Sequence, residues 1–198
     1  MKITFNSPVI LTFSFLCAGV YLLNHTFGLA EDLFKLMPIW DFGSGKWYFR
    51  LFSNAFGHGN SDHLMGNLAF VLLLGPIIEE KYGSKNTALM LFTTALVCSL
   101  IHLSYSSSSL WGASGIVFML ILLTSLVNFK QGEIPLSFLL IVLVYIGKEI
   151  MGTFSDDTTS HMTHIVGGIV GAVFGFMMNK RSATKAKKVP ANPMDSLP

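Results

Sequence analysis

Long apolar segments, separated by short polar ones, occupy most of the chain. A helix needs roughly 20 mostly apolar residues to span the hydrocarbon of a bilayer, and several of these segments lie at the short end of that range. The pattern predicts spans at about residues 8–29, 62–78, 87–103, 113–129, 135–151 and 162–178. We therefore predict an all-α fold: a polytopic membrane protein with a bundle of six transmembrane helices.

The composition supports this prediction and excludes other classes. Hydrophobic residues make up 52% of the chain and charged residues only 12%, whereas about a quarter of an average soluble domain is charged. The net charge of +2 is too small to indicate a nucleic-acid partner. Cys17 and Cys98 both lie in apolar segments and indicate neither a disulfide framework nor a CxxC site.

The basic residues predict the orientation. With six spans and a cytoplasmic N-terminus, nine of the 13 Lys and Arg residues lie on the cytoplasmic side and four on the other. Because positive loops favour the cytoplasm, we expect both termini there.

Two segments fall outside the regular spans. Residues 1–179 are predicted to form one membrane domain, followed at 180–198 by a basic, disordered cytoplasmic tail. Residues 30–56 mix many aromatic side chains with charges, which is typical of the headgroup level of a bilayer. We expect this segment to be partly helical and to lie in the outer interface.

Three predicted spans carry polar side chains near their outer ends: His63 and Asn67, then Ser114, then His164. Ionisable groups in a bilayer are costly and usually face the interior of a bundle or a wet cavity. These four residues are therefore the candidate catalytic residues.

Ser114 lies in the sequence Gly112-Ala113-Ser114-Gly115 at the start of a span. A nucleophilic serine needs close approach of substrate and free backbone N–H groups for the developing oxyanion, which glycines and a helix start provide. The alternative is a small-residue packing contact between helices.

His164 precedes glycines that lie on its own face of a helix, at positions 167, 168, 171 and 175. Such a strip lets a neighbouring helix approach closely, so His164 could accept the proton of Ser114 as a general base. Plain close packing is the alternative for His164, and His161, on a similar face, competes for the role of base. The other outer histidines, His25 and His102, are interpreted as interfacial.

His63 and Asn67 are four residues apart and so share one face of a helix. Both can donate hydrogen bonds to an oxyanion. Helix capping is the alternative.

Between about residues 47 and 176 the chain resembles the rhomboid family of intramembrane serine proteases. The resemblance rests on the order and spacing of Arg50, His58, His63, Asn67, Glu79 with Gly83-Ser84, Gly112-Ala113-Ser114-Gly115 and His164-Ile-Val-Gly167.

The resemblance implies a serine endopeptidase with a Ser114–His164 dyad, no third acidic residue, no metal and no cofactor. It implies an oxyanion hole of His63, Asn67 and the Ser114 N–H group. His58 would support the site with Gly112, Gly115, Gly167 and Gly168, while Arg50 and Glu79 would be structural. Substrates would be single-span membrane proteins, cut toward the outer face of a bacterial inner membrane.

Two other functions remain open at this stage. One is a rhomboid-like protein that binds membrane clients without cutting them. The other is a metal-binding membrane protein built on His58, His63, His161 and His164, although the sequence has no HExxH motif and few acidic residues within its spans.

Overall fold

The computed structural model describes residues 3–28, 31–127, 133–152 and 160–188, with side chains to residue 178. Within these ranges the regular structure is helical, and β-pairing is limited to an isolated antiparallel bridge between Leu36 and Leu110. The all-α prediction is confirmed.

In the described part of the chain, four helices are long and apolar enough to cross a bilayer: α1 (Pro8–Phe27), α4 (Ser61–Tyr82), α5 (Ser84–Tyr105) and the first part of α9 (His161–Lys188). The two remaining predicted spans correspond to shorter elements. These are α6 (Ser114–Ser125) and a continuous run of α7 (Leu136–Ile141), the π-helical η2 (Val142–Ile146) and α8 (Gly147–Gly152). The count of six spans thus stays a prediction.

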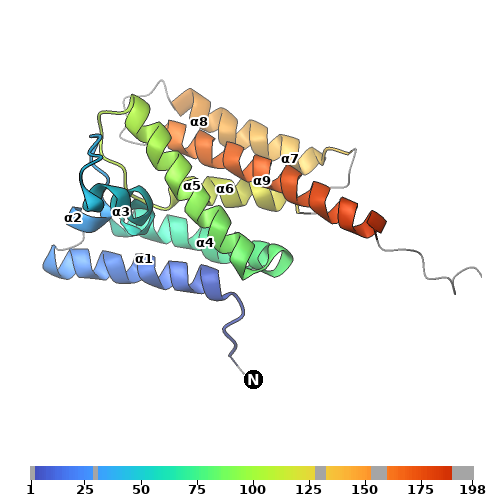
Figure 1. Ribbon diagram of the computed structural model, residues 1–198, viewed down its shortest axis with the longest axis horizontal. Helices are drawn as coiled ribbons and strands as arrows, with labels where there is room; N and C mark the ends of the chain where they lie inside the picture. Colours follow the sequence, from blue (N-terminus) through green and yellow to red (C-terminus); the bar gives the residue numbers. More distant parts are fainter. Residues whose placement is uncertain (1–2, 29–30, 128–132, 153–159, 189–198) are drawn as a thin grey trace, which may run out of the picture.

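Helix α6 forms the centre of the bundle. Every residue from Gly115 to Leu123 is buried, so α6 is enclosed around its whole circumference. Its largest contact is with α9, followed by α4. Figure 1 shows α1 along one edge of the molecule and the α7–α8 run along the opposite edge, with the other long helices between them.

The outer helices direct apolar side chains away from this core. Examples are Phe15 on α1, Leu73 on α4 and Leu143 on η2, each about two-thirds exposed. Apolar surface of this extent is expected where lipid takes the place of water. The α7–η2–α8 run, all of which is described, has one buried residue, Glu149.

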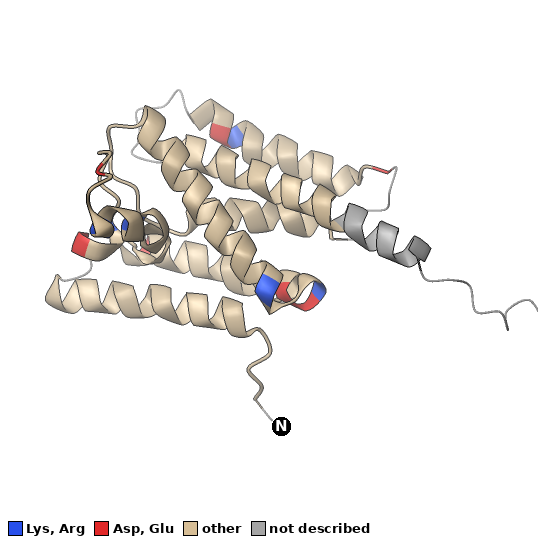
Figure 2. Cartoon of the chain, viewed as in Figure 1, with Lys and Arg blue, Asp and Glu red and all other residues tan. Residues whose placement is uncertain are grey.

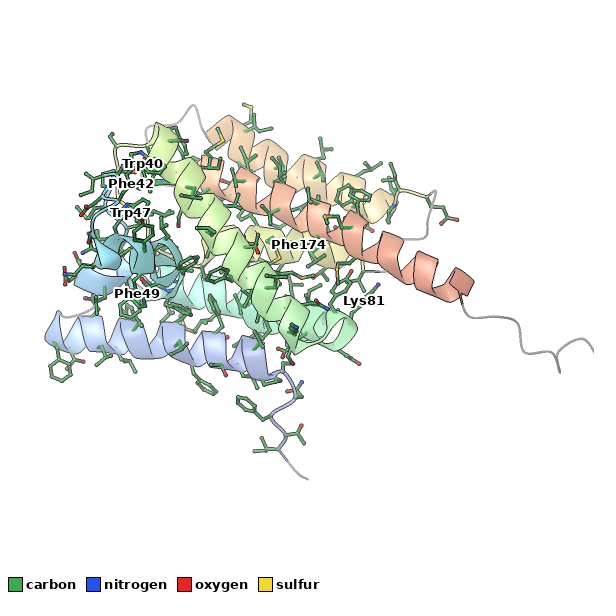
Figure 3. The ribbon with its side chains drawn as sticks, in the orientation of Figure 1. Trp40, Phe42, Trp47, Phe49, Lys81 and Phe174 are labelled. Carbon is green, nitrogen blue, oxygen red and sulfur yellow. The ribbon has the colours of Figure 1, made fainter. Side chains whose placement is uncertain are left out.

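Residues 31–56 are partly helical, as predicted, and contain α2 (Glu31–Phe34), α3 (Gly45–Ser53) and the short 3₁₀ helix η1 (Asn54–Phe56). Trp40, Phe42 and Trp47 lie together here with ring centroids 5.3–5.9 Å apart (Figure 3). Their position at the headgroup level remains a prediction.

Helix α9 extends past residue 180, where the predicted cytoplasmic tail begins, and the disorder of that tail stays a prediction. Helix α9 continues to Lys188, consistent with the high helix propensity of the alanines, lysines and arginine in this stretch. Residues 189–198, the rest of the predicted tail, lie outside the described part of the chain.

Glu79 on α4 caps the start of α1. Its carboxylate oxygens accept hydrogen bonds from the backbone N–H groups of Val9 and Ile10, both at 3.0 Å, and from the Ser84 hydroxyl at 2.7 Å. The residue at the cap position, Ser7, makes no side-chain capping bond. A buried carboxylate from another helix therefore satisfies N–H groups that α1 leaves unpaired.

We expect Glu79→Ala to lower the free energy of unfolding by about 2–4 kcal/mol, because two buried N–H groups lose a charged acceptor. Unfolding in mixed detergent micelles, followed by circular dichroism, measures this change. The neighbouring exposed residue supplies the control, since Glu80→Ala should leave the free energy almost unchanged. Equal losses for both variants would contradict the capping role.

Candidate active site

Ser114 is the first residue of α6, and the turn before it depends on glycine. Gly112 has a φ of 129°, a conformation that residues with a Cβ rarely adopt. Its N–H group donates to the Asn54 carbonyl at 2.9 Å, which holds the turn against η1. The side chain of Ser114 is partly exposed at the beginning of a helix whose first N–H groups have no carbonyl partner within the helix.

His164 lies one turn into α9, and glycines bring this helix against α6. A Cβ added to Gly167 would overlap the carbonyl oxygen of Gly115, and one added to Gly171 would overlap that of Met119. The predicted close approach of the two helices is therefore present. Gly168 instead faces the side chain of Ile146, 2.7 Å from the position its Cβ would take.

The His164 ring lies over the face of α6 that also carries Ser114. It stacks on Phe118, four residues after Ser114, with centroids 4.5 Å apart and planes 5° from parallel. Among the described residues, no hydrogen bond joins the Ser114 hydroxyl to His164. Catalytic hydrogen bonds are often long in the absence of substrate and tighten when it binds.

Glu149 of α8 holds the other side of the His164 ring. Its Oε2 lies 2.8 Å from His164 Nδ1 and 2.6 Å from His161 Nδ1. An ionised carboxylate can only accept hydrogen bonds, so each Nδ1 carries the hydrogen, and in the neutral form of the His164 ring Nε2 keeps its lone pair. An acidic partner thus lies beside His164, whereas the resemblance to the rhomboid family implied a dyad with no third acidic residue.

His63 lies against the turn that precedes Ser114. A Cβ on Gly112 would be 2.5 Å from Cε1 of the His63 ring. The cap of α4 is Asn60, whose side chain accepts from the His63 N–H group at 2.8 Å. The His63 ring is therefore not needed for capping and is directed toward the Gly112 turn.

Asn67 is buried one turn later on α4 and is joined to His58. Its Nδ2 lies 3.0 Å from His58 Nε2, and His58 Nδ1 lies 3.2 Å from the Phe56 carbonyl. Since that carbonyl can only accept, Nδ1 carries the hydrogen and Nε2 accepts from the Asn67 amide. Burial, followed by the nearby His63, lowers the pKa of His58 to about 4, which keeps the ring neutral.

His102 differs from the interfacial residue expected from the sequence, because it is 1% exposed. Its Nε2 donates to the Ser108 carbonyl at 2.9 Å, and Nδ1 lies 3.2 Å from the Ser160 hydroxyl. These bonds fasten the polar loop between α5 and α6 to the start of α9. This is a structural role for His102 that the sequence pattern did not indicate.

Arg50 fastens α3 to α2. Its guanidinium donates to the Asp32 backbone carbonyl, at 2.9 Å from Nε, and to the Asp32 carboxylate at 3.1 Å. A hydrogen bond from Lys46, together with the charges of Lys46 and Arg50, lowers the pKa of Asp32. These contacts hold α2 against α3, and the structural role of Arg50 stays a prediction.

The family model of the Rhomboid domain matches residues 45–181, which include every candidate site residue. The chain belongs to the rhomboid family. It is accordingly a helical integral membrane protein.

Three relatives illustrate the range of this family. The rhomboid is 24% identical over 170 residues to the Rhomboid protease GlpG of Haemophilus influenzae, covering 88% of that protein. It is 26% identical over 183 residues to the Rhomboid-like protein 11, chloroplastic, of Arabidopsis thaliana, covering 62% of it. It is 29% identical over 174 residues to the Rhomboid-related protein 1 of Caenorhabditis elegans, covering 47% of it. These alignments span 82–83% of this chain.

Glu149 is a residue of the candidate site that the sequence pattern did not predict. The available signal was an acidic side chain within the apolar segment 135–151. An ionisable residue inside a span is a functional candidate in its own right. Asp157, an acidic residue seven positions before His164, lies outside the described residues.

Proposed function

We propose that this rhomboid is an intramembrane serine endopeptidase with Ser114 as nucleophile and His164 as base. One observation carries the proposal: α9 is packed against α6 through glycines, so that His164 lies over the face of α6 that begins with Ser114. Two helices distant in sequence thereby present a hydroxyl and an imidazole to the same space.

Glu149 completes the proton-transfer arrangement. The Glu149 carboxylate accepts a hydrogen bond from Nδ1 of His164, which directs the Nε2 lone pair away from α8. This lone pair is the acceptor for the Ser114 proton. When Ser114 attacks a peptide carbonyl, this proton moves to Nε2 and the carboxylate stabilises the imidazolium. The proton then passes to the leaving amine, and water activated by His164 hydrolyses the acyl-enzyme.

The oxyanion would be held beside the Gly112 turn. The Ser114 backbone N–H group, the His63 ring and the second hydrogen of the Asn67 amide are the donors in our proposal. The bonds of His58 hold the Asn67 amide in place and leave one amide hydrogen for this purpose. Loss of one such donor typically lowers the rate by ~10²–10³.

Substrates would be single-span membrane proteins cut near their outer ends, with both termini of the protease in the cytoplasm of a bacterium. A substrate helix must unwind locally to expose its backbone, so we expect small or helix-breaking residues near the cut. If the protein binds such substrates but does not cleave them, it is a client-binding protein.

Reconstitution in liposomes with a single-span test substrate separates these functions. We expect two fragments whose masses add up to the substrate plus one water, formed in many turnovers per protease. An intact substrate recovered in a stoichiometric complex would contradict the proposal and favour client binding.

A further inference from the structure

The geometry points to a zinc site formed by Glu149, His161 and His164, whose occupation switches the protease off. Binding at this site is independent of the proposed function, whereas the inhibition rests on it. The three side chains come from α8 and α9 and offer one carboxylate oxygen and two imidazole nitrogens, all within 4.8 Å of one another.

The donor atoms select the metal. Two imidazoles and a carboxylate, with room for water as a fourth ligand, form a common zinc environment, whereas Mg²⁺ and Ca²⁺ prefer oxygen ligands alone. Tetrahedral zinc with bonds of about 2.0–2.1 Å places its ligand atoms roughly 3.3 Å apart. Glu149 Oε2 is already 2.6 Å and 2.8 Å from the two Nδ1 atoms, so the ligands need to move by only about an ångström.

Burial of Glu149 is a second reason to expect a metal cation at this site. Glu149 is 5% exposed, and in the described part of the chain its ion-pair partners are the two histidines, with no lysine or arginine within ion-pair distance of its carboxylate. A buried carboxylate is costly without a cation to compensate it. Zinc would supply that charge. Along the α7–η2–α8 run, Figure 2 shows charge only within α8, where Lys148 and Glu149 are adjacent.

Neighbouring groups hold both imidazoles in place. The His161 ring fills the position that a side chain at Gly152 would occupy, 2.6 Å from its Nδ1 to the ideal Cβ. The His164 ring is stacked on Phe118. Two rings with few alternative positions lose little freedom when they bind a metal, which favours affinity.

Zinc at Nδ1 of His164 would remove the general base. A neutral imidazole that binds metal through Nδ1 carries its hydrogen on Nε2, to which it moves through water. An Nε2–H group cannot accept the proton of Ser114. Without zinc, the hydrogen bond from Nδ1 to Glu149 keeps His164 in the tautomer that can accept the proton. With zinc bound at Nδ1, the ring is held in the tautomer with its hydrogen on Nε2, which cannot.

The decisive variant is His161→Gln, which removes one ligand outside the proposed catalytic machinery and keeps a donor for Glu149. Equilibrium dialysis of Zn²⁺ against the Ser114→Ala protein should give one ion per chain. His161→Gln in that background should weaken binding by about 100-fold, given that even the loss of an outer hydrogen-bond partner of a ligand costs ~10–100-fold. His25→Gln, at an exposed histidine of α1, should bind as before.

Cleavage assays on proteins with Ser114 intact then test the consequence. Zn²⁺ should inhibit the wild type and His25→Gln, EDTA should restore both, and His161→Gln should cleave normally but resist zinc. Co²⁺ gives a readout that needs no variant, because a four-coordinate site produces an intense visible spectrum. Undiminished zinc binding by His161→Gln, binding without inhibition, a weak six-coordinate cobalt spectrum, or activation by zinc would each overturn the inference. A protein that binds zinc through His161 but cleaves nothing would contradict the proposed function alone.

Discussion

Ser114→Ala should reduce cleavage of a single-span substrate by at least about 10⁴-fold while the protein remains folded. No other group at the start of α6 can form the acyl-enzyme, and removing a nucleophile typically costs as much as removing the whole catalytic unit. The side chain makes no hydrogen bond among the described residues, so the free energy of unfolding should change by less than about 0.5 kcal/mol. Initial rates of fragment formation in liposomes measure the loss.

The matched control is Ser104→Ala, which removes an exposed hydroxyl near the end of α5 that, among the described residues, donates to the Ile101 carbonyl of its own helix. Its rate should equal that of the wild type. His164→Ala should lose as much activity as Ser114→Ala, and the double variant no more than either alone, because the two residues act as a unit. Residual cleavage by Ser114→Ala within tenfold of the wild type would remove Ser114 from the mechanism.

Gly167→Ala should destabilise the protein by at least about 3 kcal/mol, a large value for the addition of one methyl group. The new Cβ would overlap a backbone carbonyl, that of Gly115, which cannot rotate away as a flexible side chain could. The helices α6 and α9 must separate instead. Cleavage should fall as well, because the separation moves His164 away from Ser114.

Gly19→Ala is the control for this prediction. Nothing lies within 4 Å of the position its Cβ would take on α1. Replacing this helical glycine should therefore be neutral or stabilise the fold by up to about 1 kcal/mol. Unfolding in mixed micelles compares the two variants directly. A Gly167→Ala protein as stable as Gly19→Ala would show that the two helices are not in close contact.

The sequence pattern predicted the helical class and the close approach of a neighbouring helix to the glycine face of α9, because apolar segments and a glycine strip are visible in the order of residues. The glycine strip indicated a close helix contact without identifying the partner helix. In the structure, a side chain at Gly167 or Gly171 would overlap the backbone of the neighbouring helix. The spacing of His63 and Asn67 likewise predicted a shared helix face.

Other features depend on tertiary contacts that no local pattern encodes. The carboxylate of Glu79 caps a helix almost 70 residues away, and the Asn67 amide is held by His58 from the loop before α4. Glu149 lies 15 residues before His164, and the packing of α8 beside α9 brings them together. The 12 residues of α6 also show why a span count from hydropathy alone is uncertain, since a helix enclosed by protein need not match the bilayer in length.

Labelling with a serine-directed fluorophosphonate probe tests the central proposal most directly. The detergent-solubilised protein is treated with the probe, digested and mapped by mass spectrometry, with His164→Ala treated in parallel. We predict one modified residue, Ser114, and strongly reduced labelling in the variant that lacks the base. Modification of a different serine, or equal labelling of Ser114 without His164, would contradict the account.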